Sequence, residues 1–250
     1  MNLVMTIIQT ELSIKPKRLI LATLFNIIGT VLFYTVLAKG FGLLNLQNQM
    51  APMPESLFTG IIGLIAAWTA FELPTMRTWT LVSHTGIIDL LRMGRYHFWQ
   101  LYLGKSIAYW IEVQYHIIIA SLVLYALIGF SIHPVFLPLY WIYLMAGSIF
   151  LVHLGFLCGV LITHGEWHCY IWLWLLTPIV LMSGVMTMPS LLDGWFKYVV
   201  LALPTTALIA GGRSLVVSQS LNLIWVLQLV AADILFGMFS YYFIRRKLQQ

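Results

Sequence analysis

Apolar runs separated by short polar or charged stretches make up most of the chain. Six of these runs predict membrane-crossing helices, because about 20 apolar residues span the hydrocarbon core of a bilayer. They lie at residues 19–38, 57–73, 106–130, 139–162, 170–182 and 222–244. Ahead of them, residues 3–14 carry apolar side chains at helical spacing and precede the basic residues Lys15, Lys17 and Arg18. This pattern predicts an N-terminal amphipathic helix on the membrane surface.

The stretch after the fifth run departs from the pattern. Ser183-Gly184 and Pro189 interrupt the helix, yet an apolar and aromatic segment follows where a polar loop would be expected. Pro204 begins a second short apolar segment, which ends near Gly211-Gly212-Arg213. Segments too short to span are tolerated in a membrane only where protein or a cavity shelters their backbone. The stretch therefore predicts a re-entrant helix pair between the fifth and sixth spans.

Composition agrees with a membrane protein. The chain has 61% hydrophobic and 8% charged residues and a mean hydropathy of +0.92, whereas a soluble domain has about 25% charged residues. We therefore expect an all-α integral membrane fold in a single domain, residues 1–250. The net charge of +5 does not predict nucleic-acid binding, because the basic residues lie near the ends of the spans. A cleaved signal peptide and a disulfide framework are not expected either.

The distribution of positive charge predicts an orientation. If the N-terminus is cytoplasmic, ten of the thirteen Lys and Arg residues fall on the cytoplasmic side, and only Lys39, Lys197 and Arg213 fall outside. The positive-inside rule therefore favours both termini in the cytoplasm. The re-entrant pair is then external, and residues 75–105 are cytoplasmic.

Within residues 75–105, a short amphipathic helix is expected between Gly86 and Gly94. One interpretation is an interfacial helix that rests on lipid. The other is a docking surface for a cytoplasmic partner, formed by Gly86, Ile87, Asp89, Leu90, Leu91, Arg92 and Arg95. The chain contains no glycine-rich phosphate-binding loop, so ATP-driven work would have to come from a separate ATPase chain.

Ionisable residues at membrane depth are costly and are functional candidates by default. Glu112 and His116 are four residues apart on one predicted helix and could pair, and Asp233 lies near the middle of the last span. The alternative for each is a structural role in pairing helices. A metal site is not expected, since the His and Glu residues of the 163–168 stretch do not share a helix face. The sequence contains no motif of a catalytic nucleophile, so an enzyme is not expected.

The broken stretch also carries a family resemblance. It resembles the C-terminal signature of ABC-2-type transporter permeases, although Trp195 follows Asp193-Gly194 and not a proline. The matching residues are Ser183, Gly184, Pro189, Trp195, Pro204, Thr205 and Arg213. In addition, Gly86, Asp89 and Leu91 loosely fit the coupling-helix pattern of that family, and Gly104-Lys105 resembles the start of its third span.

The resemblance implies a non-catalytic permease subunit of an ATP-binding cassette exporter in the inner membrane of a bacterium. It implies no cofactor on this chain, with ATP and Mg bound by a separate cytoplasmic ATPase subunit. It also implies a second permease subunit, and we expect a homodimer surrounded by membrane lipid.

Three hypotheses about what the protein transports, and how, are open. The apolar and aromatic first, third and fifth spans favour efflux of a drug, antibiotic or lipid-like amphipathic molecule. A polysaccharide or glycolipid exporter is the alternative within the family. From another class, an ion-coupled transporter or channel would use Asp233 and Glu112.

The re-entrant stretch predicts an external gate. Leu192, Phe196 and Val200 recur every four residues and would share one helical face, with Trp195 beside them. Two such faces across a dimer axis would form a hydrophobic lid that dewets when closed. The alternative is that this patch packs onto the outer leaflet.

Overall fold

The computed structural model describes residues 3–12, 16–45, 53–83, 98–128, 136–162, 170–171, 176–185 and 192–249. Every regular element in these ranges is a helix, which confirms the all-α expectation. The elements are α1 (Leu3–Leu12), α2 (Pro16–Asn45), α3 (Met53–Ser83), α5 (Phe98–Ile128), α6 (Phe136–Gly147), α7 (Ile149–Leu161), α9 (Thr177–Val180), the π-helical turn η2 (Leu181–Val185), α10 (Gly194–Ala202), α11 (Pro204–Val217) and α12 (Leu223–Gln249).

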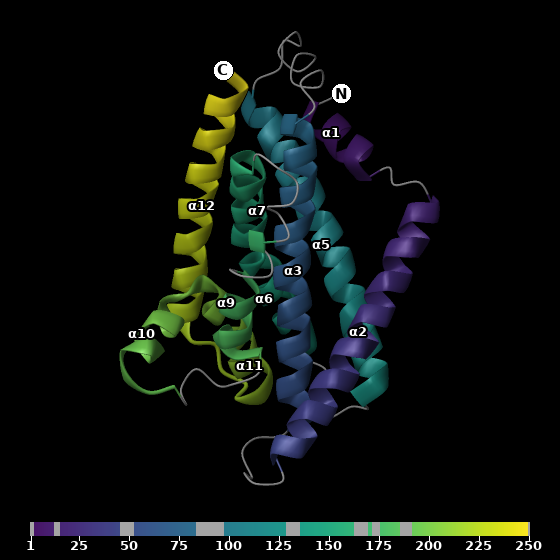
Figure 1. Ribbon diagram of the computed structural model, residues 1–250, viewed down its shortest axis with the longest axis vertical. Coiled ribbons are helices and arrows are strands. Elements are labelled where there is room, and N and C mark those ends of the chain that lie inside the picture. Colours follow the sequence, from purple (N-terminus) through teal and green to yellow (C-terminus); the bar gives the residue numbers. More distant parts are fainter. Residues whose placement is uncertain are drawn as a thin grey trace.

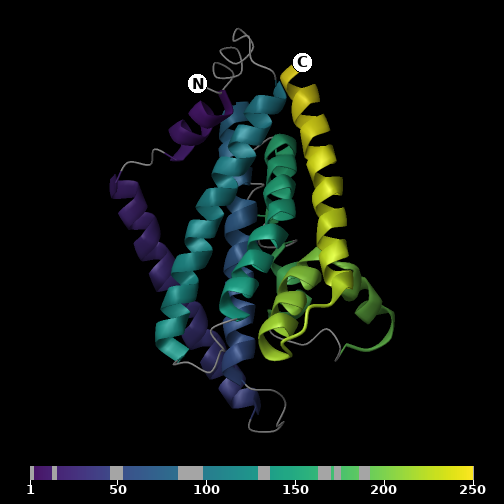
Figure 2. The ribbon, with the colours of Figure 1, turned by 180° about the vertical axis from the view of Figure 1, so that it is seen from behind.

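The long helices form an elongated bundle. In Figure 1, α3, α7 and α12 run along the long axis, and α2 slants across α5. Figure 2 shows the same α2–α5 neighbourhood from behind. The short α1 and the C-terminal end of α12 lie at one end of the bundle, and α10 and α11 lie towards the other end.

The described helices fit an integral membrane protein. Four are long and apolar enough to cross a bilayer: Ser56–Ser83, Trp99–Ile128, Phe136–Leu161 and Leu223–Arg246. The α10–α11 pair, bent by 86°, makes a fifth if it counts as one span, and Ile20–Val36 of α2 is a shorter apolar helix. The six-span count stays a prediction. The 86° bend fits the expected re-entrant pair, because neither helix of the pair continues the direction of the other.

Two predicted boundaries are wrong. The second span was expected to end at residue 73, but α3 continues through Pro74 to Ser83, and α5 begins at Phe98, well before residue 106. A proline inside a helix removes one backbone hydrogen bond, a cost that tertiary packing can offset. Here α7 packs against the same turns of α3, where its glycines meet Phe71, Pro74 and Thr75.

Two glycines bring α7 onto α3. A Cβ added at Gly155 would lie 2.5 Å from Phe71 O and 2.7 Å from Pro74 Cγ, and one added at Gly159 would lie 2.6 Å from Thr75 O. These glycines are four residues apart, the small-residue spacing that lets membrane helices approach closely. The predicted fourth span is α6 and α7 in succession, joined at Ser148, whose N–H donates to Leu144 O.

The core surrounds α3. Its side chains from Phe58 to Phe71 are largely buried, and Ile209 of α11 packs so close to Gly63 that a Cβ there would lie 2.9 Å from Ile209 Cγ1. By contrast, α2 and α12 expose many large apolar side chains. In a bilayer these surfaces can face lipid, so the exposure agrees with membrane insertion.

Candidate functional site

A cavity of about 460 Å³ lies between α2, α3 and α5. This volume is within the range of about 300–1,000 Å³ typical of small-molecule sites. Most of its wall is apolar or aromatic, including Phe25, Phe33, Ile65, Trp68, Leu73 and Met76. Polar groups interrupt the wall at a few positions, namely Asn26, Thr30, Thr69, Glu72, Arg77, Glu112 and His116.

The α3 wall combines an aromatic ring with a carboxylate. Trp68 and Glu72 are one helical turn apart on the same face, and Trp68 Nε1 donates a hydrogen bond to Glu72 Oε2. Phe33 of α2 meets the Trp68 ring edge-on, with 6.0 Å between the ring centroids. Among the side chains that the structure describes, no cation pairs with Glu72.

The α2 wall is tied to α5 by polar contacts. Asn26 Nδ2 donates to the His116 carbonyl at 2.9 Å and lies 3.2 Å from His116 Nδ1. The hydroxyls of Thr23 and Tyr115 are 2.6 Å apart one turn earlier on α2. Between these contacts and α3, Gly29 leaves open space, because a Cβ added there would meet no heavy atom within 4 Å. The cavity is therefore bounded by α2 but not filled by it.

An ion-pair network borders the cavity on the side of α1. Arg77 Nη2 lies 2.7 Å from Glu112 Oε1, Arg77 Nη1 lies 3.7 Å from Glu11 Oε2, and Lys105 Nζ lies 2.6 Å from Glu11 Oε1. Arg77 also stacks over the Tyr109 ring at 5.1 Å. The expected pair between Glu112 and His116 is not formed, since Glu112 bonds to Arg77 on α3. The network joins α1, α3 and α5, and it pairs the Glu112 carboxylate with the Arg77 guanidinium.

Asp233 belongs to a different polar cluster. Tyr102 OH lies 2.6 Å from His153 Nδ1 and 2.5 Å from Ser240 Oγ, which joins α5, α7 and α12. His153 Nε2 lies 3.4 Å from Asp233 Oδ1, without hydrogen-bond geometry. This cluster shares no residue with the Arg77–Glu112 network. The two predicted acidic candidates, Glu112 and Asp233, are therefore not brought together.

Three residues of the predicted signature, Ser183, Thr205 and Arg213, lie at one junction of the fold. Ser183 Oγ donates to Ile179 O at 2.6 Å and lies 2.6 Å from Thr205 Oγ1, which joins η2 to α11. Gly184 has a φ of 113°, a backbone conformation that favours glycine and ends the helical path. Pro189 lies outside the described residues.

Arg213 holds the same junction from α11. It is 7% exposed, and its Nη2 lies 3.2 Å from Ser56 O and 3.4 Å from Val185 O, while Nε lies 3.4 Å from Thr59 Oγ1. The guanidinium thus bridges the start of α3 and the end of η2. Ser183, Thr205 and Arg213 thus join η2, α11 and the start of α3.

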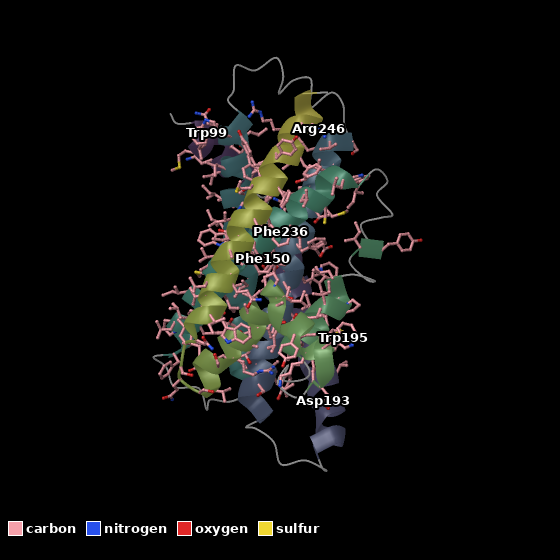
Figure 3. The ribbon with its side chains drawn as sticks, turned by 90° about the vertical axis from the view of Figure 1, so that its left-hand side faces the viewer. Trp99, Phe150, Asp193, Trp195, Phe236 and Arg246 are labelled. Carbon is pink, nitrogen blue, oxygen red and sulfur yellow. The ribbon has the colours of Figure 1, made fainter. Side chains whose placement is uncertain are left out.

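The expected gate face is wrong in its geometry. Leu192 precedes α10, which begins at Gly194, so it cannot continue the face of Phe196 and Val200. Val200 is 1% exposed and points into the subunit, and Phe196 is half-buried. Trp195 is 76% exposed, and Figure 3 shows it beside Asp193 on this segment.

The predicted docking segment lies outside the described residues, so its role stays a prediction; its residues are Gly86, Ile87, Asp89, Leu90, Leu91, Arg92 and Arg95. The 163–169 stretch lies outside them as well. The cavity is not predicted from the sequence, although Trp68 and Glu72, at helical spacing on a short predicted span, mark one of its walls.

Comparison with known families gives one match. The family model described as ABC-2 type transporter matches residues 3–217, which include every element that lines the cavity. No curated protein and no solved structure shows a significant match to the chain.

Proposed function

The chain belongs to the ABC-2 type transporter family, and from this premise we propose that it is the permease of an exporter for drug, antibiotic or lipid-like amphipathic molecules. Membership of the family makes the chain a membrane permease of an ABC transporter. Such permeases are generally non-catalytic, and the family implies a partner that hydrolyses ATP. The proposal adds the substrate class, the outward direction and a homodimeric assembly in the inner membrane of a bacterium, with both termini cytoplasmic.

The substrate class is supported by the cavity between α2, α3 and α5. An amphipathic molecule needs an apolar surface for most of its area and a few polar groups for its head. The wall offers Phe25, Phe33 and Trp68 for the first requirement and Glu72 and Asn26 for the second. A long, strongly hydrated polysaccharide would gain little from such a wall.

Coupling to ATP hydrolysis is assigned to residues 86–95, with Asp89 and Arg92 contacting the ATPase. We assign an external gate to α10. Its exposed side chains Trp195 and Tyr198 would face a second subunit, whereas Val200 is buried. Both assignments complete the exporter hypothesis, and neither is needed for the cavity to bind substrate.

Filling the cavity tests the proposal. Gly29→Trp would place an indole in the open space beside Gly29 without displacing a neighbouring atom at the Cβ position. We expect ATP-dependent transport of a fluorescent amphipathic dye, in proteoliposomes that contain the permease and its ATPase, to fall by about tenfold or more. Gly29→Ala, which adds only a methyl group, should transport within about twofold of the unmodified protein.

The amount of folded protein separates a blocked cavity from a damaged fold. Both Gly29 variants should elute as a single symmetric species in size-exclusion chromatography. Full dye transport by folded Gly29→Trp would rule out this cavity as the substrate site.

A further inference from the structure

We propose that the cavity between α2, α3 and α5 selects amphipathic cations, with the Glu72 carboxylate as the group that pairs with the positive charge. This inference rests on the proposed function, because it takes the same cavity as the substrate site, and it adds the charge of the substrate. It follows from the charge balance of the wall, the accessibility of Glu72 and the aromatic rings beside it.

The described part of the cavity wall has a net negative charge. Among the described residues, the wall carries two carboxylates, Glu72 and Glu112, and one guanidinium, Arg77. Arg77 lies 2.7 Å from Glu112, and its other terminal nitrogen is turned to Glu11 at 3.7 Å. Glu112 is therefore compensated by Arg77, whereas no cation among the described side chains compensates Glu72.

Glu72 presents an accessible oxygen on the wall. Its Oε2 accepts the hydrogen bond from Trp68, which fixes the side chain along α3. Its Oε1 accepts no hydrogen bond from a described residue. This oxygen is not buried, so an occupant of the cavity can reach it. Burying a carboxylate in apolar surroundings costs free energy unless a cation pairs with it. A positively charged occupant should therefore bind more tightly than a negatively charged one.

The aromatic side chains favour the same occupant. A cation near the face of an indole or phenyl ring is attracted by the ring quadrupole. Trp68 stands next to Glu72 in the wall, and Phe33 closes on Trp68 from α2. An organic cation can thus place its charge at Glu72 and its apolar groups against these rings.

Two probes of the same shape and opposite charge test the inference. Tetraphenylphosphonium and tetraphenylborate are measured by equilibrium dialysis against the full-length permease with its ATPase, in nanodiscs of zwitterionic lipid, without ATP. Empty nanodiscs supply the correction for partition into lipid. We expect the unmodified protein to bind the phosphonium more tightly than the borate.

Variants assign the preference to one carboxylate. Glu72→Gln keeps the size of the side chain and an acceptor for Trp68 but removes the charge, and it should weaken phosphonium binding by about tenfold. Glu72→Asp keeps the charge and should retain most of the preference. Asp193→Asn removes an exposed carboxylate on the α10 segment and should change nothing. Gly29→Trp should abolish binding of both probes, which places them in this cavity.

The outcomes separate this inference from the exporter hypothesis. Equal binding of the two probes by the unmodified protein, or unchanged phosphonium binding by Glu72→Gln, would overturn the inference even if dye transport depends on Gly29. Conversely, Glu72-dependent phosphonium binding without ATP-dependent transport of any amphipathic compound would sustain the cation site and reject the exporter. Glu72→Asp controls for damage to the fold, because it changes the same residue but keeps the charge. It should bind the phosphonium more tightly than Glu72→Gln does.

Discussion

Single residues decide where the fifth apolar run ends. The sequence predicted a break at Ser183-Gly184, and the φ of 113° at Gly184 shows that the backbone turns there. The same sequence placed Arg213 among the external cations, whereas it is buried against Ser56 and Thr59. A local break can be read from local residues. A contact across more than 150 positions cannot, because nothing near Arg213 in the chain specifies its acceptors.

The conformation of Gly184 leads to a stability prediction. Gly184→Ala puts a Cβ on a backbone with positive φ, which costs about 1–3 kcal/mol and should lower the midpoint of thermal unfolding in detergent. Gly29→Ala is the matched control, because its Cβ meets no neighbour and alanine favours a helix. An unfolding midpoint for Gly184→Ala equal to that of Gly29→Ala would show that the turn is not strained by a side chain.

At the scale of elements, packing overrides local signals in two places. The predicted second span ends at residue 73, just before Pro74, but α3 continues through the proline, where Gly155 and Gly159 let α7 pack closely against it. In α10, a spacing of four placed Leu192 on the face of Phe196, but the helix begins only at Gly194, whose φ is 68°. Periodicity predicts which residues share a face only where the helix is continuous.

The α3–α7 contact predicts a strong effect of side-chain size. In Gly159→Leu the new Cβ would lie 2.6 Å from Thr75 O, a backbone atom that cannot move without shifting α3. We expect destabilisation of about 1–3 kcal/mol or more, seen as a lower yield of monodisperse protein and a lower unfolding midpoint. Gly29→Leu adds the same side chain into open space and should unfold near the unmodified protein. Equal behaviour of the two variants would contradict the close approach of α7 to α3.

For the whole molecule, composition and span length were enough to predict an all-helical membrane protein, and the family match agrees with the resemblance seen in the broken stretch. The cavity was not predicted, because it is formed by three helices that meet only in the folded chain. Each helix has an ordinary apolar sequence, and the polar positions Asn26, Glu72 and His116 become a site only when α2, α3 and α5 place them around one space.

The orientation of the whole molecule gives the last prediction. Asp193 and Arg246 are exposed, and Figure 3 shows them towards opposite ends of the bundle. Most Lys and Arg residues belong to the side on which both termini were predicted, and positive charge is retained in the cytoplasm. In a background with Cys158→Ala and Cys169→Ala, an impermeant maleimide added to whole cells should therefore label Asp193→Cys and leave Arg246→Cys unlabelled. Permeabilised cells should label both, which controls for access. Labelling of Arg246→Cys alone in whole cells would invert the topology, and the segment at 86–95 would then face away from any cytoplasmic ATPase.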